Sequence, residues 1–346
     1  MAEDVERSDI QGIVARGYGH LKAASFHLLT VTDPAATRRW LGSVAPLITT
    51  SDAEPTEFSL NLAFTHGGLR HLGLSDAVLA QFPVEYSEGM TTSHRRRVLG
   101  DIGQNAPEEW RWGGPSNPPV HILVLLYGAD QAALSRAHER CLGPDHRLGM
   151  EEVGTLATIL LTDKEHFGFH DGISQPVIDG LHRPGPWANT IRPGEIVLGY
   201  QNEYGQYPRR LWVDPASDPD GVLQGSRSGS DGADFGLNGS YLVFRQLSQD
   251  VRGFWRYLEE VTRNADGTAN PHAQTRLGAK WVGRWPSGAP LVTCPEVDDP
   301  SMADFNDFGY HETDPAGLRC PIGSHVRRSH PRDSLDPDPG SRKSIA

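Results

Sequence analysis

Hydrophobic and polar positions in the first 165 residues follow two alternating spacings, which predict strands and helices in turn. Ala23–Val31 is strand-like, and Glu57–Thr65 alternates apolar and polar residues as a half-buried strand does. Val120–Gly128 is a nearly continuous apolar run, typical of a buried strand, and Leu156–Leu161 is a fourth expected strand. The pattern therefore predicts a sheet of several strands in this half.

Helical spacing follows the first and the third of these strands. Asp33 and Pro34 have the types expected of an N-cap and a first helical residue. Apolar residues then recur at helical spacing, at Trp40, Leu41, Val44 and Leu47. A further helix is expected over Asp130–Cys141, and the stretch GGLRHLGL at 67–74 predicts a short one.

The second half repeats the order of strand and helix. Ser240–Val261 predicts a strand, then Asp250 as a cap, then a helix with one apolar face, formed by Val251, Phe254, Trp255, Leu258 and Val261. Because this loosely echoes Ser25–Val44, we expect an α+β fold of two ferredoxin-like domains, antiparallel sheets with helices packed on one face, over residues 1–165 and 166–346. The long irregular segments at 184–195 and 214–238 are of the kind that lines a site or is partly disordered.

Composition limits the classes of protein. The 346 residues are 37% hydrophobic and 22% charged, with mean hydropathy −0.45, as expected of a soluble globular protein with no membrane span. A net charge of −12 argues against a nucleic-acid partner, since phosphate binding needs clustered Lys and Arg. The first residues are acidic and lack a signal-peptide pattern, so we expect a cytoplasmic protein.

The cysteines offer neither a disulfide framework nor a zinc site. Cys141, Cys294 and Cys320 are odd in number and far apart, and no Cys-x-x-Cys pair occurs. The absence of a Gly-x-Ser-x-Gly stretch and of a P-loop also gives no support to a serine hydrolase or a nucleotide-binding enzyme.

The stretch FGFHDGISQP at 167–176 places Asp171 between Gly168 and Gly172. Glycines allow backbone angles that other residues resist. One interpretation is a glycine-framed turn in which Asp171 caps its own backbone. The other is that the glycines let a flat ligand lie against the loop, with the carboxylate directed at it.

A second distinctive stretch is CPIGSHVRRSHPRD at 320–333. His325 and His330 are five residues apart, which fits no common zinc spacing. An imidazole is, however, the usual axial ligand of haem iron that handles oxygen or peroxide, and nearby arginines can pair with propionates. A carboxylate across the iron could move a proton between the two peroxide oxygens.

Together the two stretches resemble the motifs of the dye-decolourising (DyP-type) haem peroxidases. That family carries a Gly-x-x-Asp-Gly motif and a Cys-Pro-x-Gly/Ala-x-His-x-Arg run ending in Asn-Pro-Arg. The resemblance extends over nearly the whole chain, through DIQGIVARGYGHLKAASFHLLTV, LNLAFTHGGLRHLGL, NGSYLVFRQLSQDVRGFW and VGRWPSGAPL.

The resemblance implies roles for single residues. It implies haem b as cofactor, His325 as the axial ligand of its iron, Asp171 as the distal acid, and Gly168 and Gly172 as the frame of the distal loop. Arg332 matches the arginine that contacts a haem propionate. A departure is that His330 stands where the family has Asn.

A larger departure concerns the C-terminal end. The family pattern continues into a strand with a distal arginine and a later acidic residue, which the printed sequence does not reach. Arg342 comes too early to be that arginine and is not assigned the role. We therefore expect a C-terminal domain that lacks the family's last strands.

The resemblance implies an enzyme that reduces hydrogen peroxide and oxidises dyes, phenols or other small one-electron donors. Electrons from bulky donors would pass through aromatic side chains, for which the candidates are Trp255, Trp281, Trp285 and Tyr310, although core or loop-anchoring roles suit each of them better. Two alternatives stay open: a haem-binding protein with little peroxidase activity, and a cofactor-free remnant that serves as an assembly partner. A homo-oligomer is also left open.

Overall fold

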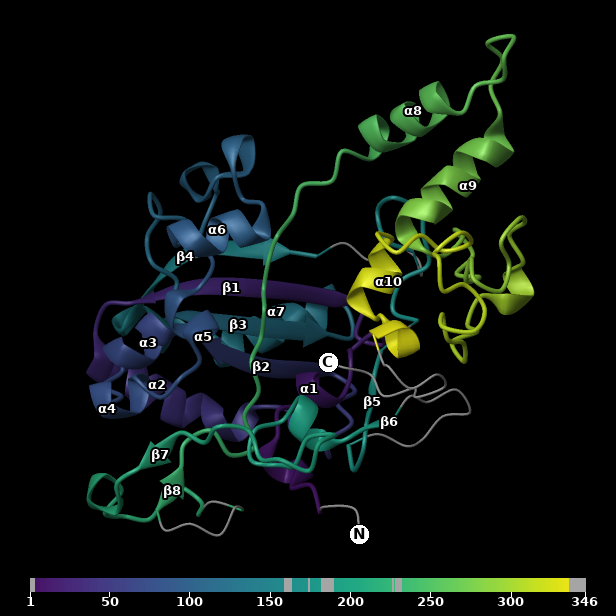
Figure 1. Cartoon of the computed structure of the whole chain (residues 1–346). Helices are drawn as coiled ribbons and strands as arrows, with labels where there is room; N and C mark the ends of the chain where they lie inside the picture. The colour runs from purple at the N-terminus through teal and green to yellow at the C-terminus, as the bar shows by residue number, and fades with distance from the viewer. Residues whose placement is uncertain are drawn as a thin grey trace. The chain divides into compact units, whose positions relative to one another are not determined.

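The computed structural model describes residues 4–158, 164–173, 175–181, 190–225, 227 and 232–335 (Figure 1). By compactness the chain forms two units. The first consists of Met1–Leu160 and Ile196–Val243, and the second of Leu161–Glu195 and Phe244–Ala346. The segment Ile196–Val243 therefore packs with the N-terminal unit, whereas a division into 1–165 and 166–346 was expected.

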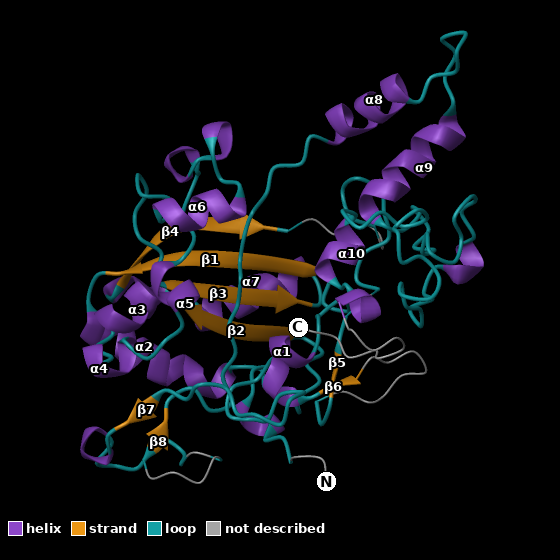
Figure 2. Cartoon of the chain, in the orientation of Figure 1, coloured by secondary structure: helices purple, strands orange, loops and turns teal. Residues whose placement is uncertain are grey.

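The first unit is built on a four-stranded antiparallel sheet, drawn in orange in Figure 2. Its strands are β1 (Ala23–Val31), β2 (Phe58–Phe64), β3 (Ile122–Gly128) and β4 (Met150–Ala157). They lie in the order β2-β3-β1-β4, and β3 pairs with both β1 and β2. With a helix after β1 and another after β3, this is the ferredoxin-like arrangement that the spacing predicted.

Two helices cover one face of this sheet and form the main core with it. They are α2 (Pro34–Val44) and α7 (Gln131–Cys141). Asp33 caps α2 by accepting from the amides of Ala35 and Ala36, so the predicted cap is confirmed. Trp40 of α2 is buried and its indole donates to the Cys141 carbonyl at 2.9 Å, which ties the two helices together.

Short elements complete the first unit. Its other helices are α1 (Gly12–Ala15), α3 (His66–His71), α4 (Asp76–Leu79), α5 (Val84–Glu88) and α6 (Ser93–Leu99), and two-residue strands β7 (Trp212–Val213) and β8 (Ala233–Asp234) pair in its second segment. The 3-10 turns are Arg7–Asp9, Ala45–Leu47, Gly103–Asn105, Pro107–Glu109, Pro144–Leu148 and Pro215–Ser217.

The described residues of the second unit lie mostly in loops and turns, from which three α-helices stand out. Helices α8 (Val251–Val261) and α9 (Pro271–Val282) pack against each other, and α10 (His325–Ser329) contacts α9 (Figure 1). Two-residue strands β5 (Val177–Ile178) and β6 (Thr190–Ile191) form a parallel pair. The 3-10 turns are Pro193–Glu195, Pro300–Met302 and Arg332–Leu335. A separate core surrounds the buried Trp285 and Tyr310.

Most predicted elements are confirmed, but two predictions are wrong in place or type. The fourth strand begins at Met150 rather than Leu156, and residues 159–161 of the expected strand lie outside the described residues. The strand expected after Ser240 is not formed, since residues 239–250 belong to no strand. Alternating side chains make a strand only where a neighbouring strand supplies the hydrogen-bonded ladder. The helix after Asp250 is confirmed, and its cap accepts from the Gly253 amide.

None of the helices formed by the described residues has both the length and the apolar character needed to cross a membrane.

Candidate active site

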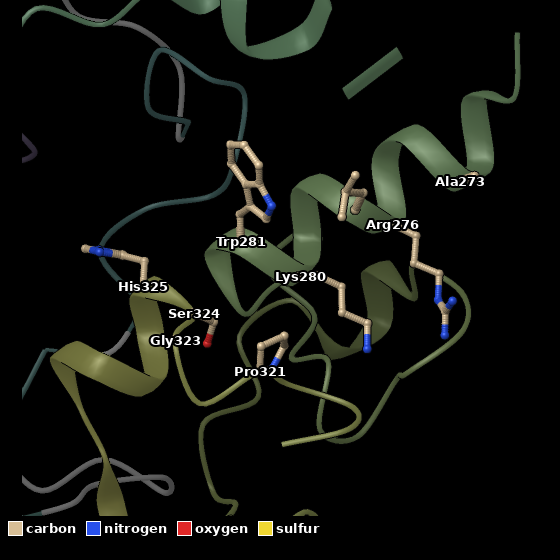
Figure 3. A pocket seen from close by; sticks show the side chains of 9 residues that line it. Ala273, Arg276, Lys280, Trp281, Pro321, Gly323, Ser324 and His325 are labelled. Atoms are coloured by element: carbon tan, nitrogen blue, oxygen red, sulfur yellow. The ribbon is translucent and has the colours of Figure 1, made fainter. Parts of the chain in front are cut away.

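The predicted ligand His325 is the first residue of α10. Ser324 precedes it as the N-cap, and the His325 side chain is exposed. Among the described residues no hydrogen-bond partner is recorded for its imidazole. His325 is among the residues that line a pocket of about 760 Å³ within the second unit, and in Figure 3 its ring points away from Lys280 and Arg276. His325 is thus accessible and has nitrogens that are free to act as a ligand.

Helix α9 forms most of this pocket. Figure 3 shows Trp281 and Lys280 at the end of α9, Arg276 one turn earlier, and His325 at the start of α10. Leu277 and Trp281 supply apolar surface. Arg276 pairs with Glu296 at 2.7 Å, and Lys280 donates to the Leu318 carbonyl at 2.6 Å. The pocket therefore combines apolar walls with two cations near its edge.

A buried ion pair fixes the helix that carries His325. Arg327 and Asp314 have side chains only 3% exposed, and Nη1 of Arg327 lies 3.3 Å from Oδ2 of Asp314. The same nitrogen donates to the Asp314 and Cys320 carbonyls at 3.0 and 2.9 Å. Asp314 also accepts from the amides of Leu318, Arg319 and Cys320. The carboxylate thus orders the loop before α10, and Arg327 ties α10 to that loop.

The end of α9 packs closely on α10. Gly283 follows α9 with φ +100°, and a Cβ added there would meet Val326 Cβ at 3.0 Å and Ser324 Oγ at 3.1 Å. Positive φ and this close approach both require glycine. The buried Cys320 thiol lies 3.2 Å from the Ser324 hydroxyl, so the first residue of the predicted motif packs beneath the cap of α10.

The loop around Asp171 has the backbone that its glycines predicted. Gly168 and Gly172 have φ of +96° and +79°, and a Cβ at either would meet nothing within 4 Å. Asp171 is exposed, and its Oδ1 accepts from the Gly172 amide at 2.7 Å. The capped-turn interpretation is therefore confirmed, and the carboxylate still has an oxygen facing outward to a ligand or to water.

Glu165 anchors this loop, a role that the sequence analysis missed. Its two carboxylate oxygens accept from the amides of Phe167 and Phe169, at 2.8 and 2.9 Å. Phe169 is buried, its ring lies 6.1 Å from that of Trp255 in a stacked arrangement, and its edge faces Gly278 of α9. The signal for this anchor was a carboxylate two residues before Phe167, a common Asx- or Glu-type turn pattern that alone carries little weight.

Arg332 lies in the interior rather than beside the pocket. Its φ is +53°, its side chain is buried, and it donates to the Asn306 and Phe308 carbonyls at 2.8 and 2.9 Å. Burial lowers the pKa of Arg332 below its ordinary value. Within the described part of the chain its buried Nε has no hydrogen-bond partner.

Burial also lowers the pKa of the neighbouring His330. Loss of solvent, followed by the positive charges of Arg332 and Arg284, lowers the pKa of His330 from 6.5 to about 4. The imidazole is therefore neutral near pH 7, as the asparagine that the family has in this place would be.

The structure brings the two motifs to one helix but not into one pocket. Both approach α9: the distal-type loop through Phe169 on Gly278, and His325 through the pocket that it shares with Trp281. Asp171 and Arg332 are not among the residues that line this pocket. Arg342 lies outside the described residues.

The four aromatic candidates for electron transfer differ in exposure. Trp285 and Tyr310 are buried, and the Trp285 indole donates to the Cys294 carbonyl. Trp255 donates to the Phe167 carbonyl and so anchors the loop. Trp281 is 46% exposed and borders the pocket of His325, so it alone of the four is both solvent-accessible and beside the pocket.

Comparison with known proteins finds relatives of one kind. No family model matches the chain. A dye-decolorizing peroxidase from Mycena epipterygia is 31% identical over 90% of this chain and 57% of its own length, and one from Exidia glandulosa is 28% identical over 94% and 62%. A solved ancestral D-type dye decolorizing peroxidase is 28% identical over 97% of this chain and 72% of its own, with a TM-score of 0.76. In sequence and in fold the chain is therefore similar to dye-decolourising peroxidases over nearly its whole length. It spans 57% to 62% of the length of these two curated relatives.

A haem group, the cofactor of this peroxidase family, fits the pocket beside His325. Among the described residues, no cluster of three or more His, Cys, Asp or Glu side chains could hold a metal ion. A single imidazole instead suits a metal that arrives with its own equatorial ligands, as in a porphyrin. The volume lies in the range of about 300–1,000 Å³ that small-molecule and cofactor pockets have. His325 and the apolar side of α9 suit a flat apolar group that carries one metal.

Proposed function

We propose that this protein is a haem-dependent peroxidase that reduces hydrogen peroxide and oxidises small one-electron donors. The observation that carries the proposal is the His325 imidazole, which is exposed on a cofactor-sized pocket and has no recorded partner among the described residues. The family relationship supports the same conclusion.

Haem b would be held without a covalent link to the protein. The three cysteines stand at 141, 294 and 320, so no Cys-x-x-Cys-His attachment motif is present in the sequence. His325 would bind the iron, and Leu277 and Trp281 would cover part of the ring. Arg332, to which the resemblance assigns a propionate contact, is buried and does not line this pocket. When bound, the haem supplies the redox chemistry with peroxide.

Asp171 would supply the proton transfer. Its carboxylate is exposed and is held from behind by the Gly172 amide, an arrangement that fixes one oxygen and leaves the other to accept a proton from the inner peroxide oxygen and return it to the outer one. Glu165 would keep the loop in place without touching peroxide, because both of its oxygens are engaged by backbone amides. Gly168 and Gly172 would provide the turn.

Phenols and dyes are the proposed donors. A solved dye-decolorizing peroxidase, 25% identical with a TM-score of 0.73, is described in complex with 2,6-dimethoxyphenol. In this chain a donor too large for the pocket would reach Trp281, whose ring lies 5.6 Å from that of Tyr257. Both side chains are about half exposed, at 46% and 49%, so an electron could enter from the surface.

The proposal is tested by turnover after reconstitution with hemin. With hydrogen peroxide and 2,6-dimethoxyphenol we expect Asp171→Ala to lower kcat/KM for peroxide by about 100- to 10,000-fold. Asp179→Ala, an exposed acid in the same unit, serves as the matched control and is expected to retain the activity. If Asp171→Ala turns over peroxide as fast as the control does, the assigned proton transfer is wrong.

A haem-binding protein with little peroxidase activity is the second candidate. The observation in its favour is that Asp171 is not among the residues lining the pocket of His325. Saturable hemin binding without turnover in the same experiment would decide for it. The cytoplasmic location and a homo-oligomer remain predictions from the sequence.

A further inference from the structure

A second large pocket lies wholly within the first unit, apart from all residues assigned above. Its volume is about 870 Å³, and it is bordered by the N-terminal segment around Asp9, strands β2 and β3, the region from α3 to α5, and the segment Ile196–Leu242. The proposed peroxidase chemistry uses none of these residues. Its volume again suits a small organic molecule.

The walls of this pocket are strongly apolar. Leucine and phenylalanine side chains dominate, among them Leu62, Leu69, Phe82, Leu125 and Leu198. Leu62, Phe82 and Leu125 are buried, and Leu69 and Leu198 are half-buried. Because the free energy falls when apolar surface is removed from water, binding of an apolar molecule would be favoured over water in this pocket.

The few polar groups at the pocket present hydrogen-bond acceptors. Oδ2 of Asp9 accepts from the Asn238 amide group at 2.7 Å, and no bond to its Oδ1 is recorded among the described residues. The Tyr86 hydroxyl donates to the Phe64 carbonyl at 2.7 Å, which leaves the phenol oxygen as an acceptor. The Ser240 hydroxyl likewise donates, to the Ile196 carbonyl. The Tyr241 hydroxyl also borders the pocket and can donate or accept. The Asp9 carboxylate can only accept, so a ligand group that binds Asp9 must bring the donor.

The charged residues around the pocket also favour a ligand head that is not anionic. Asp9 is the one charged residue among those bordering the pocket, and no Lys or Arg is among them. Arg38 approaches from outside and donates to the Leu72 carbonyl at 2.8 Å. Asp9 is exposed, and a carboxylate or phosphate head there would meet a like charge with no Lys or Arg among the described residues that border the pocket.

The backbone beside Asp9 is held in an uncommon conformation. Asn238 has φ +63°, is buried, and is fixed by the Tyr200 hydroxyl at 2.6 Å and by Asp9. Non-glycine residues in this region are sparse and gather where a ligand is clamped. The polar end of the pocket is thus rigid and pre-arranged.

We propose that this pocket binds a neutral or cationic amphiphile, with its apolar body among the leucines and a hydrogen-bond-donating head, an amine or a hydroxyl, at Asp9. A polypeptide segment or a second copy of the chain would instead cover the pocket from outside, and the test separates these cases.

The test uses N-phenyl-1-naphthylamine, an apolar fluorescent probe with one N–H donor, and two competitors of equal chain length below their micelle concentrations. We expect saturable binding of one probe per chain, and displacement by decylamine at a concentration at least tenfold lower than by decanoate. Asp9→Asn should bring the two competitors within about threefold of each other.

Variants that fill the pocket with a larger side chain test binding of the apolar body separately from binding of the head group. Leu198→Trp and Leu69→Trp enlarge half-buried side chains at the pocket and should each weaken probe binding at least tenfold. Leu318→Trp, at a position 79% exposed in the other unit, is the control and should leave binding unchanged. Non-saturable binding, filling variants that bind like the control, equal displacement by decanoate, or a dimer that excludes the probe would each overturn the proposal.

Discussion

Removal of the buried Arg327 guanidinium should destabilise α10, the helix that carries His325. In Arg327→Leu the Asp314 carboxylate loses its cation, and the Asp314 and Cys320 carbonyls lose a charged donor. Asp314 still accepts from three backbone amides, so it would remain ionised and buried. The native state would therefore hold a buried charge without its partner.

The expected cost follows from this geometry. Breaking a buried ion pair by removing one partner costs about 3–5 kcal/mol. At a denaturant slope of about 2 kcal/mol per molar urea, 4 kcal/mol lowers the midpoint for the second unit by about 2 M. The same 4 kcal/mol would speed hydrogen exchange of α10 amides that open with the unit by about a thousandfold. Arg327→Lys keeps the charge but not the planar fork, so we expect an intermediate loss.

Urea titration and native-state hydrogen exchange of residues 325–330 measure the effect. Arg328→Leu is the matched control, since Arg328 is the exposed neighbour with the same charge, and among the described residues its guanidinium has no recorded hydrogen bond. We expect it to change stability by no more than about 0.5 kcal/mol. If Arg327→Leu and Arg328→Leu behave alike, the ion pair does not hold α10 and the reasoning is refuted.

Two further predictions concern residues around the two motifs. The pKa of His330 is lowered to about 4 in the folded chain, so the unfolded chain binds more protons between about pH 6.5 and 4. The free energy of unfolding therefore falls as the pH drops through this window, by about 3 kcal/mol in all. His330→Gln should remove this part of the pH dependence, and urea midpoints that drop equally in both proteins between pH 7 and 4.5 would contradict the prediction. Glu165→Ala leaves the Phe167 and Phe169 amides without their acceptor, so local stability should fall by about 1–2 kcal/mol. Hydrogen exchange of residues 167–172 should then accelerate about tenfold, whereas the control Lys164→Ala should leave it unchanged. Unchanged exchange in Glu165→Ala would show that Glu165 is not the anchor of this loop.

The sequence pattern predicted those parts of the fold that depend on near neighbours. Asp33 and Asp250 cap the helices that follow them, because an N-cap needs only its own side chain and amides two or three residues on. The positive φ of Gly168 and Gly172 was predictable for the same reason. Strand β1 was predicted to the residue, since its alternation reflects a sheet that forms within the same unit.

Distant partners account for what the sequence did not predict. The residues after Ser240 alternate like a strand, yet strand formation depends on a neighbouring strand that sequence spacing cannot supply. The role of Asp314 rests on Arg327, thirteen residues on and across a loop. Helix α9 does carry local signals in the sequence, with Asn270 as its cap, Pro271 as its first residue and Gly283 just past its end.

Hemin titration of the purified chain, followed by visible absorption, tests the central claim most directly. The account predicts saturable binding of one hemin per chain with the Soret band of histidine-ligated ferric haem. That band should be lost in His325→Gly and restored when free imidazole is added, while His311→Gly, another histidine of the second unit, should bind like the unaltered chain. Absence of saturable binding, or an unchanged Soret band in His325→Gly, would contradict the assignment of His325 as the iron ligand.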